Sequence, residues 1–258
     1  MPQVFNNLFH EVSGNEGDRC HYPTRLDTYG CGCQHNCGYC YARSLLAFRG
    51  MWNPLSPSNA SYREIVKAVA KLRPGSVVRL GGMTDCFQPV EAARKLTLRT
   101  IGLLNRRRVH YLIVTKSDLV SQPEYLAAMD PALAHIQVSI TTTDPETSLA
   151  LEPGAPVPER RIAAVERLAA AGFDTSIRLS PYIPELVDPE VIRGISCGKL
   201  LVEFLRVNTW IERWMKGTGL PVDLGRYTEF SSGYKHLTLA KKRALLETLN
   251  WGGAGFSM

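Results

Sequence analysis

The sequence lacks any long apolar run. No stretch of about eighteen consecutive apolar residues occurs among the 258, so no transmembrane helix is expected. Residues 1–17 have neither the charged start nor the apolar core of a signal peptide, which predicts a cytoplasmic location. Internal repeats and low-complexity segments are also missing. Together with the length, this favours one large α/β domain over two small ones.

Paired cysteine spacing is a second absence. The chain has seven cysteines, an odd number. A secreted disulfide-stabilised protein spreads its cysteines through a small, loop-rich chain, whereas here three lie together at Cys33, Cys37 and Cys40. This clustering favours metal ligation in a reducing compartment.

A strong charge of one sign is missing as well. The formal net charge is +6, and charged residues make up 21% of the chain. This mild basic excess is compatible with a polyanionic partner such as nucleic acid, but it does not identify a substrate.

Apolar runs and helical patterns alternate along most of the chain. The series of six β-α units predicts a parallel sheet with right-handed crossovers, and the count falls short of the eight units of a full barrel. One helix is expected over 90–107, and another is expected to begin with a capping box in which Ser121 faces Glu124. Strands are expected at 24–29, 76–80, 110–115, 135–141, 175–179 and 200–207.

The fold class expected from this pattern is α/β, a partial (β/α)6 barrel with an irregular C-terminal extension. The expected division is an N-terminal extension at 1–23, the barrel at 24–207 and a segment at 208–258 that closes the barrel mouth. Trp210, Trp214 and Tyr234 lie in that last segment. Such aromatics can stack on unpaired bases, but packing onto the barrel is the interpretation we favour from sequence.

The most specific pattern is C-x-x-x-C-x-x-C, formed by Cys33, Cys37 and Cys40. A compact loop of this kind can supply thiolates to three irons of a cubane cluster and leave the fourth open. A structural zinc site is the competing interpretation. It needs four ligands, and the nearby candidates Cys31 and His35 are too close in sequence to complete a tetrahedron without strain.

With the aromatic Tyr39 before its last cysteine, this motif resembles the signature of the radical S-adenosylmethionine (SAM) superfamily. The resemblance implies a partial β/α barrel, a 4Fe–4S cluster on the three cysteines and SAM on the open iron. It also implies reductive cleavage of SAM to a 5′-deoxyadenosyl radical that abstracts hydrogen from a substrate. An electron donor such as flavodoxin or ferredoxin is implied as a partner.

The resemblance extends to residues that contact SAM in that family. Gly81, Gly82, Thr84 and Asp85 follow the second strand, where the family's glycine-rich motif meets the SAM amino group; the alternative is a plain turn with Asp85 as a cap. Further SAM contacts are implied at strand ends, with an exposed lysine or ordinary strand polar residues as the alternative. These further positions are Lys116, Ser139, Thr141 and Arg178.

Several longer segments, among them TDCFQPVE at 84–91 and LEPGAPVPERR at 151–161, are similar to the spore photoproduct lyase-like branch. That lyase has a hydrogen-donating cysteine three residues before the motif aspartate, where this chain has Gly82. Cys86 is a candidate substitute donor, although a buried thiol is the favoured interpretation. Repair of the spore photoproduct itself is therefore not expected.

The resulting hypothesis is a radical SAM enzyme that acts on a nucleic acid base or nucleotide. A radical SAM enzyme for a peptide or small metabolite is the first alternative, because one fold serves many substrates. A non-catalytic nucleic-acid-binding protein with a structural metal is the second.

Overall fold

The computed structural model describes residues 9–11 and 24–251. A curved sheet dominates this part of the chain, with the strand order β1-β2-β5-β6-β7-β8-β9. All neighbours from β2 to β9 are parallel, and only β1 pairs antiparallel with β2. The strands are β1 (Phe9–Glu11), β2 (Thr24–Leu26), β5 (Val77–Leu80), β6 (His110–Thr115), β7 (Ala134–Ser139), β8 (Asp174–Tyr182) and β9 (Leu200–Phe204).

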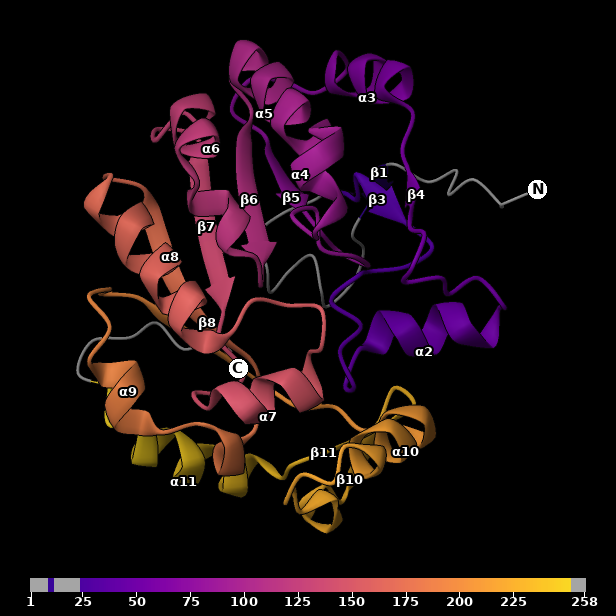
Figure 1. Ribbon diagram of the computed structural model, residues 1–258, viewed down its shortest axis with the longest axis vertical. Helices are drawn as coiled ribbons and strands as arrows, with labels where there is room; N and C mark the ends of the chain where they lie inside the picture. Colours follow the sequence, from indigo (N-terminus) through magenta and orange to yellow (C-terminus); the bar gives the residue numbers. More distant parts are fainter. Residues whose placement is uncertain (1–8, 12–23, 252–258) are drawn as a thin grey trace.

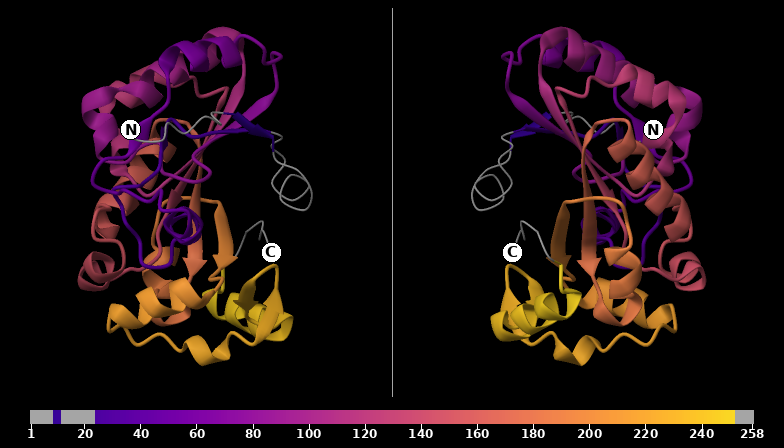
Figure 2. Two further views of the ribbon diagram at one scale, coloured as in Figure 1. Left: turned by 90° about the vertical axis from the view of Figure 1, so that its right-hand side faces the viewer. Right: turned by 90° about the vertical axis from the view of Figure 1, so that its left-hand side faces the viewer.

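The six parallel strands from β2 to β9 confirm the partial barrel. Helices gather on one face of the sheet (Figures 1 and 2), and their apolar stripes meet the apolar side chains of the strands. The helices of the barrel are α3 (Tyr62–Val69), α4 (Val90–Arg94), α5 (Leu96–Arg107), α6 (Pro123–Ala128), α7 (Pro145–Leu151), α8 (Pro158–Ala170) and α9 (Pro189–Arg193).

The helix expected over 90–107 is two helices. Lys95 lies between α4 and α5 in the left-handed conformation. The buried carboxylate of Glu91 accepts hydrogen bonds from the backbone N–H groups of Thr97 and Leu98. Because these donors lie in the first turn of α5, Glu91 caps a new helix instead of continuing the old one.

The capping box expected at Ser121 is wrong. Ser121 ends a short 3-10 helix (Asp118–Ser121) and donates to the carbonyl of Asp118, while Pro123 starts α6. Glu124 instead forms an ion pair with Lys95. The proline fits the first helical position, where no N–H donor is needed, and this moves the helix start past the serine.

The inner face of the sheet is polar. Alternation along the strands turns Arg178 of β8 away from the apolar core and toward its neighbours in β7 and β9. There its guanidinium donates to Gln137 at 2.5 Å and pairs with Glu203 at 2.5 Å. Such a face offers hydrogen bonds to a polar ligand inside the half-barrel.

The segment after residue 208 contains α10 (Thr209–Gly217), a hairpin of β10 (Glu229–Ser231) and β11 (Tyr234–His236), and α11 (Leu239–Leu249). These elements lie at the end of the sheet to which the strand arrows point (Figures 1 and 2). Ile211 and Met215 of α10 share a hydrophobic cluster with Cys37 and Tyr39. Residues 1–8, 12–23 and 252–258 of the two expected extensions lie outside the described residues.

Within the described ranges, no helix combines the length and the apolar character needed to cross a bilayer.

Candidate functional site

The cysteine loop connects β3 (Tyr29–Gly30) to α2 (Tyr41–Phe48) at the carboxyl end of the sheet. Its entry is held by the backbone, because Asn53 N–H donates to the Cys31 carbonyl at 2.7 Å. Gly32 has a φ of 154°, and a Cβ there would lie 2.0 Å from the Asn53 carbonyl oxygen. Only glycine therefore allows the two segments to lie this close.

The loop brings the three predicted ligands together. Cys33 and Cys37 are each 8% exposed, and Cys40 caps the N-terminus of α2, where its Sγ accepts from Arg43 N–H at 3.4 Å. Burial raises the pKa of all three thiols. The neighbouring Asp85, Cys37 and Cys40 raise the pKa of Cys33 further.

This donor set fits an iron–sulfur cluster. Three cysteine side chains gathered in one short loop are the ligands that iron–sulfur clusters take. Among residues 24–251 no three histidine, cysteine or acidic side chains surround a single point closely enough for one metal ion. In a cubane, by contrast, each thiolate binds its own iron, so the ligands lie further apart.

The segment that follows α7 docks onto the cysteine loop backbone to backbone. The Leu151 carbonyl accepts from Gly38 N–H at 2.8 Å, and Gly154 N–H donates to the His35 carbonyl at 3.2 Å. In return, the His35 ring is hydrogen-bonded through Nδ1 to the Gly154 carbonyl at 3.0 Å. A Cβ on Gly154 would lie 1.8 Å from the Gln34 carbonyl oxygen, so this contact requires glycine.

A fully buried charge network lies beneath this contact. Glu152 and Arg161 both have no exposed side-chain surface and form an ion pair at 2.5 Å. The Tyr39 hydroxyl donates to Glu152, and Lys116 Nζ lies 4.0 Å from the same carboxylate. Arg161 also donates to the Ser139 carbonyl at 3.3 Å, which ties β7 to the network. The loop that carries the cysteines is thus anchored electrostatically as well as through its backbone.

The turn after β5, which contains Gly81 and Gly82, is organised by Asp27. Its Oδ1 accepts the N–H groups of Gly82, Met83 and Thr84 at 2.8, 2.9 and 3.0 Å. Gly81 has a φ of +86°, which favours glycine. The Thr84 hydroxyl donates to the Tyr29 carbonyl at 2.5 Å, so this turn is fixed to the strand that leads into the cysteine loop.

Asp85 connects three parts of the site. Its carboxylate is hydrogen-bonded to His35 Nε2 at 3.1 Å, the Thr115 hydroxyl at 2.8 Å and Lys116 N–H at 2.8 Å. Burial would raise the pKa of Asp85, but the charge of His35 and these hydrogen bonds hold it below its usual range. Asp85 therefore has an architectural function in addition to the cofactor contact predicted for it.

The other predicted SAM contacts lie near the same strand ends. Lys116 Nζ lies 5.5 Å from the centre of the Tyr39 ring, and the Thr141 hydroxyl lies 3.1 Å from the Tyr39 hydroxyl. Ser139 is buried beside them. Arg178 is engaged by its neighbours in the sheet, as described above. The contact of each of these residues with SAM stays a prediction.

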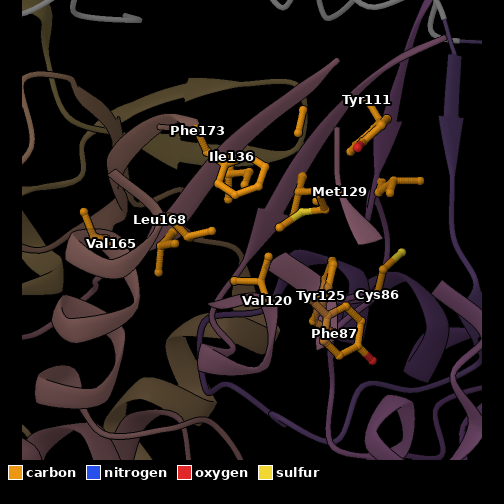
Figure 3. Close-up of a cluster of buried hydrophobic side chains, with 14 of the residues drawn as sticks. Cys86, Phe87, Tyr111, Val120, Tyr125, Met129, Ile136, Val165, Leu168 and Phe173 are labelled. Atoms are coloured by element: carbon orange, nitrogen blue, oxygen red, sulfur yellow. The ribbon is translucent and has the colours of Figure 1, made fainter. Parts of the chain in front are cut away.

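Cys86 is a buried thiol, which is the interpretation favoured from sequence. Its side chain has no exposed surface and packs in the main apolar core together with Phe87 and Tyr125 (Figure 3). The thiol contacts the Leu26 carbonyl at 3.6 Å, and burial raises its pKa. This burial favours a structural thiol over the hydrogen donor considered for Cys86. At Gly82 a Cβ would lie 2.4 Å from Arg25 Cδ, so a cysteine there would displace Arg25.

Sequence reasoning missed four residues of the site: Asp27, His35, Glu152 and Arg161. His35 was considered from sequence as a zinc ligand, yet it is buried between Asp85 and Gly154. Glu152, Gly154 and Arg161 lie in the LEPGAPVPERR segment, which was noted only for its resemblance to a family. The available signal was a glutamate and a glycine among apolar and proline residues, followed by the charged run at 159–161.

The family model described as the Radical SAM superfamily matches residues 28–193. An uncharacterised protein of Mycobacterium tuberculosis is 29% identical over 203 residues, which cover 72% of this chain and 59% of that protein. Another from Methanocaldococcus jannaschii is 32% identical over 169 residues, which cover 63% of this chain and 62% of that protein. The matched region is thus less than two thirds of each relative's length.

Among solved structures, spore photoproduct lyase complexed with dinucleoside spore photoproduct superposes with a TM-score of 0.71. The superposition covers 99% of this chain and 80% of that one, at 16% sequence identity. A variant of the same lyase with bound AdoMet gives a TM-score of 0.70 at 15% identity. At these identities the likeness establishes the fold.

Proposed function

Because this chain belongs to the radical SAM superfamily, we propose that it is a radical SAM enzyme whose cluster is held by Cys33, Cys37 and Cys40. The observation that carries the proposal is one loop at the carboxyl end of a parallel half-barrel that holds two buried cysteines, Cys33 and Cys37, and the partly exposed Cys40. When bound, the 4Fe–4S cluster supplies the electron that splits SAM and so starts hydrogen abstraction from a substrate.

The chain's own residues hold the cysteine loop in place. The 151–154 segment fixes the loop backbone, and Asp85 links His35 to the end of β6. Apolar residues of α10 pack against Cys37 and help to exclude water from the thiols. The SAM contacts in the proposal are Tyr39, Gly81, Gly82, Thr84, Asp85, Lys116, Ser139, Thr141 and Arg178.

We propose a nucleic acid base or nucleotide as the substrate class. The net charge of +6 and the polar inner face of the half-barrel support this choice. Spore photoproduct lyase, which shares the fold of this chain, is in complex with a dinucleoside, and this also supports the choice. An electron donor such as flavodoxin or ferredoxin is the proposed partner, and the cytoplasm the proposed location.

The test is a comparison of Cys37→Ala with Cys197→Ala, both purified without oxygen. Cys197 is a cysteine of the described chain outside the loop. We expect the wild-type protein and Cys197→Ala to contain iron and sulfide and to form 5′-deoxyadenosine with SAM and dithionite. Cys37→Ala should lose both properties. Zinc without iron in the wild-type protein, or product formation by Cys37→Ala, would overturn the assignment.

A further inference from the structure

A surface formed by α2 and α10 combines tryptophans with arginines. We call it the arginine–tryptophan face, and it consists of Arg43, Arg206, Trp210, Arg213 and Trp214. The Arg43 guanidinium lies 4.1 Å from the centre of the Trp214 ring, and Arg213 lies 5.9 Å from that of Trp210. The two indole rings are 5.9 Å apart. Positions 210, 213 and 214 share one side of α10 because residues three and four apart are neighbours on a helix.

The ring of Trp210 is available to a ligand. This residue is 41% exposed, whereas Ile211 and Met215 on the opposite side of α10 are 1% and 2% exposed. Packing onto the barrel uses Ile211 and Met215, and Trp214 and Tyr234 also pack against this cluster, as expected from sequence. Trp210 differs from them because its ring is exposed.

The positive charges on this face have no acidic partners. Among residues 24–251, Arg43, Arg206 and Arg213 take part in no salt bridge. The neighbouring Glu212 is already paired with Lys216 and Lys235. Arginines held over aromatic rings without carboxylates leave their donors free for an anionic ligand.

The face begins at the candidate site. Arg43 N–H donates to Cys40 Sγ, and Arg206 lies 5.8 Å from the ring of Tyr41, the residue after Cys40. α10 is fixed beside α2 because the side chain of Asn208 donates to the Ser44 hydroxyl at 3.2 Å. An extended ligand lying on this face would run from the cysteine loop outward along α10.

We propose that the arginine–tryptophan face binds an unpaired stretch of nucleic acid that leads into the barrel. Trp210 stacks on a base, and Arg206 and Arg213 contact phosphates, which is the combination that single-strand-binding surfaces use. Arginine and tryptophan are also frequent in protein–protein interfaces, but three arginines without carboxylate partners favour a polyanionic ligand. The inference rests on the proposed function, since it identifies the substrate as a base within a strand.

The experiment is fluorescence anisotropy of a labelled single-stranded oligonucleotide of about twelve residues, a length within the range of such sites. The protein is the anaerobically prepared holoenzyme, and Kd is measured at several salt concentrations. Trp210→Ala should weaken binding about tenfold through loss of stacking. Arg213→Ala should reduce the slope of log K against log salt by about 0.7.

Arg99→Ala is the matched control. Arg99 is an exposed arginine that lies 4.6 Å from the ring centre of Tyr62, but it belongs to the α3–α5 region. We expect its Kd and salt slope to equal those of the wild-type protein. If Trp210→Ala and Arg213→Ala also behave like Arg99→Ala, or if the wild-type protein binds no oligonucleotide at low salt, the inference is wrong.

SAM cleavage without oligonucleotide is measured separately on the wild-type protein. Absence of 5′-deoxyadenosine there defeats the proposed function, whatever the oligonucleotide data show. Normal cleavage together with a failed binding test defeats the arginine–tryptophan face alone.

Discussion

Glu152 and Arg161 form an ion pair without solvent exposure beside the cysteine loop. A buried pair loses much of its Coulombic attraction to desolvation, but removal of one partner leaves an uncompensated charge. The charges of Glu152 and Arg161 also act in opposite directions on the pKa of Cys37. The pair therefore affects both stability and the electrostatics of the cluster site.

The substitution Arg161→Met tests how much this buried ion pair contributes to stability. We expect the free energy of unfolding to fall by about 3–5 kcal/mol because Glu152 is left buried, and Glu152→Gln added to it should restore part of the loss. The measurement is urea unfolding of the single and double variants. Lys216→Met is the control, since the exposed Lys216–Glu212 pair contributes no more than about 0.5 kcal/mol. If Arg161→Met lowers the free energy of unfolding as little as Lys216→Met does, the prediction is contradicted.

At the scale of elements, the cysteine loop and the 151–154 segment act as one unit although more than a hundred residues separate them. Three hydrogen bonds and one glycine define the contact. The loop therefore does not present its cysteines by itself. Its geometry depends on α7 and α8, which position the docking segment.

Gly154→Ala tests this dependence. The added methyl would meet the Gln34 carbonyl, so we expect overpacking to cost about 1–3 kcal/mol and to push the loop away from the segment. The result should be a protein with a native far-UV circular dichroism spectrum and much less iron per chain. Gly198→Ala is the control, because a Cβ there meets nothing within 4 Å. Full iron content in Gly154→Ala would show that the loop holds its shape alone.

At the scale of the whole molecule, acidic residues hold both ends of the half-barrel. Asp85 joins the strand ends at the site, and at the opposite end Asp174 pairs with Lys199 and His135. Burial acts to raise the pKa of Asp174, but the hydrogen bonds from Lys199 and His135 outweigh it and lower the pKa. Both carboxyl groups are thus stronger acids in the folded state.

Stability should therefore depend on pH in the acid range. A carboxyl group with a lowered folded-state pKa stabilises the fold above its ordinary value of 3.8, and this contribution is lost as the pH falls through the folded value. We expect the urea concentration at the unfolding midpoint to decrease as the pH is lowered below about 4. Asp174→Asn should show a smaller fall than the wild-type protein. A midpoint that stays constant or rises between pH 5 and pH 3 would contradict this.

The sequence by itself determined the six β-α units and the loop of three cysteines that we propose as ligands. Periodicity indicates which side of an element is buried. Residues a few positions apart in sequence stay close together in space in any fold. Sequence reasoning missed the break between α4 and α5 and misplaced the start of α6, because Glu91 and Pro123 override the local pattern.

Tertiary structure alone decided which distant groups meet. Asp27 accepts hydrogen bonds from the backbone of residues 82–84, His35 is hydrogen-bonded to Asp85, and Glu152 accepts a hydrogen bond from Tyr39. Tertiary structure also decided that Cys86 is buried and that Trp210 is exposed. Burial and long-range pairing arise from the packing of separate elements, and no pattern within one element contains that information.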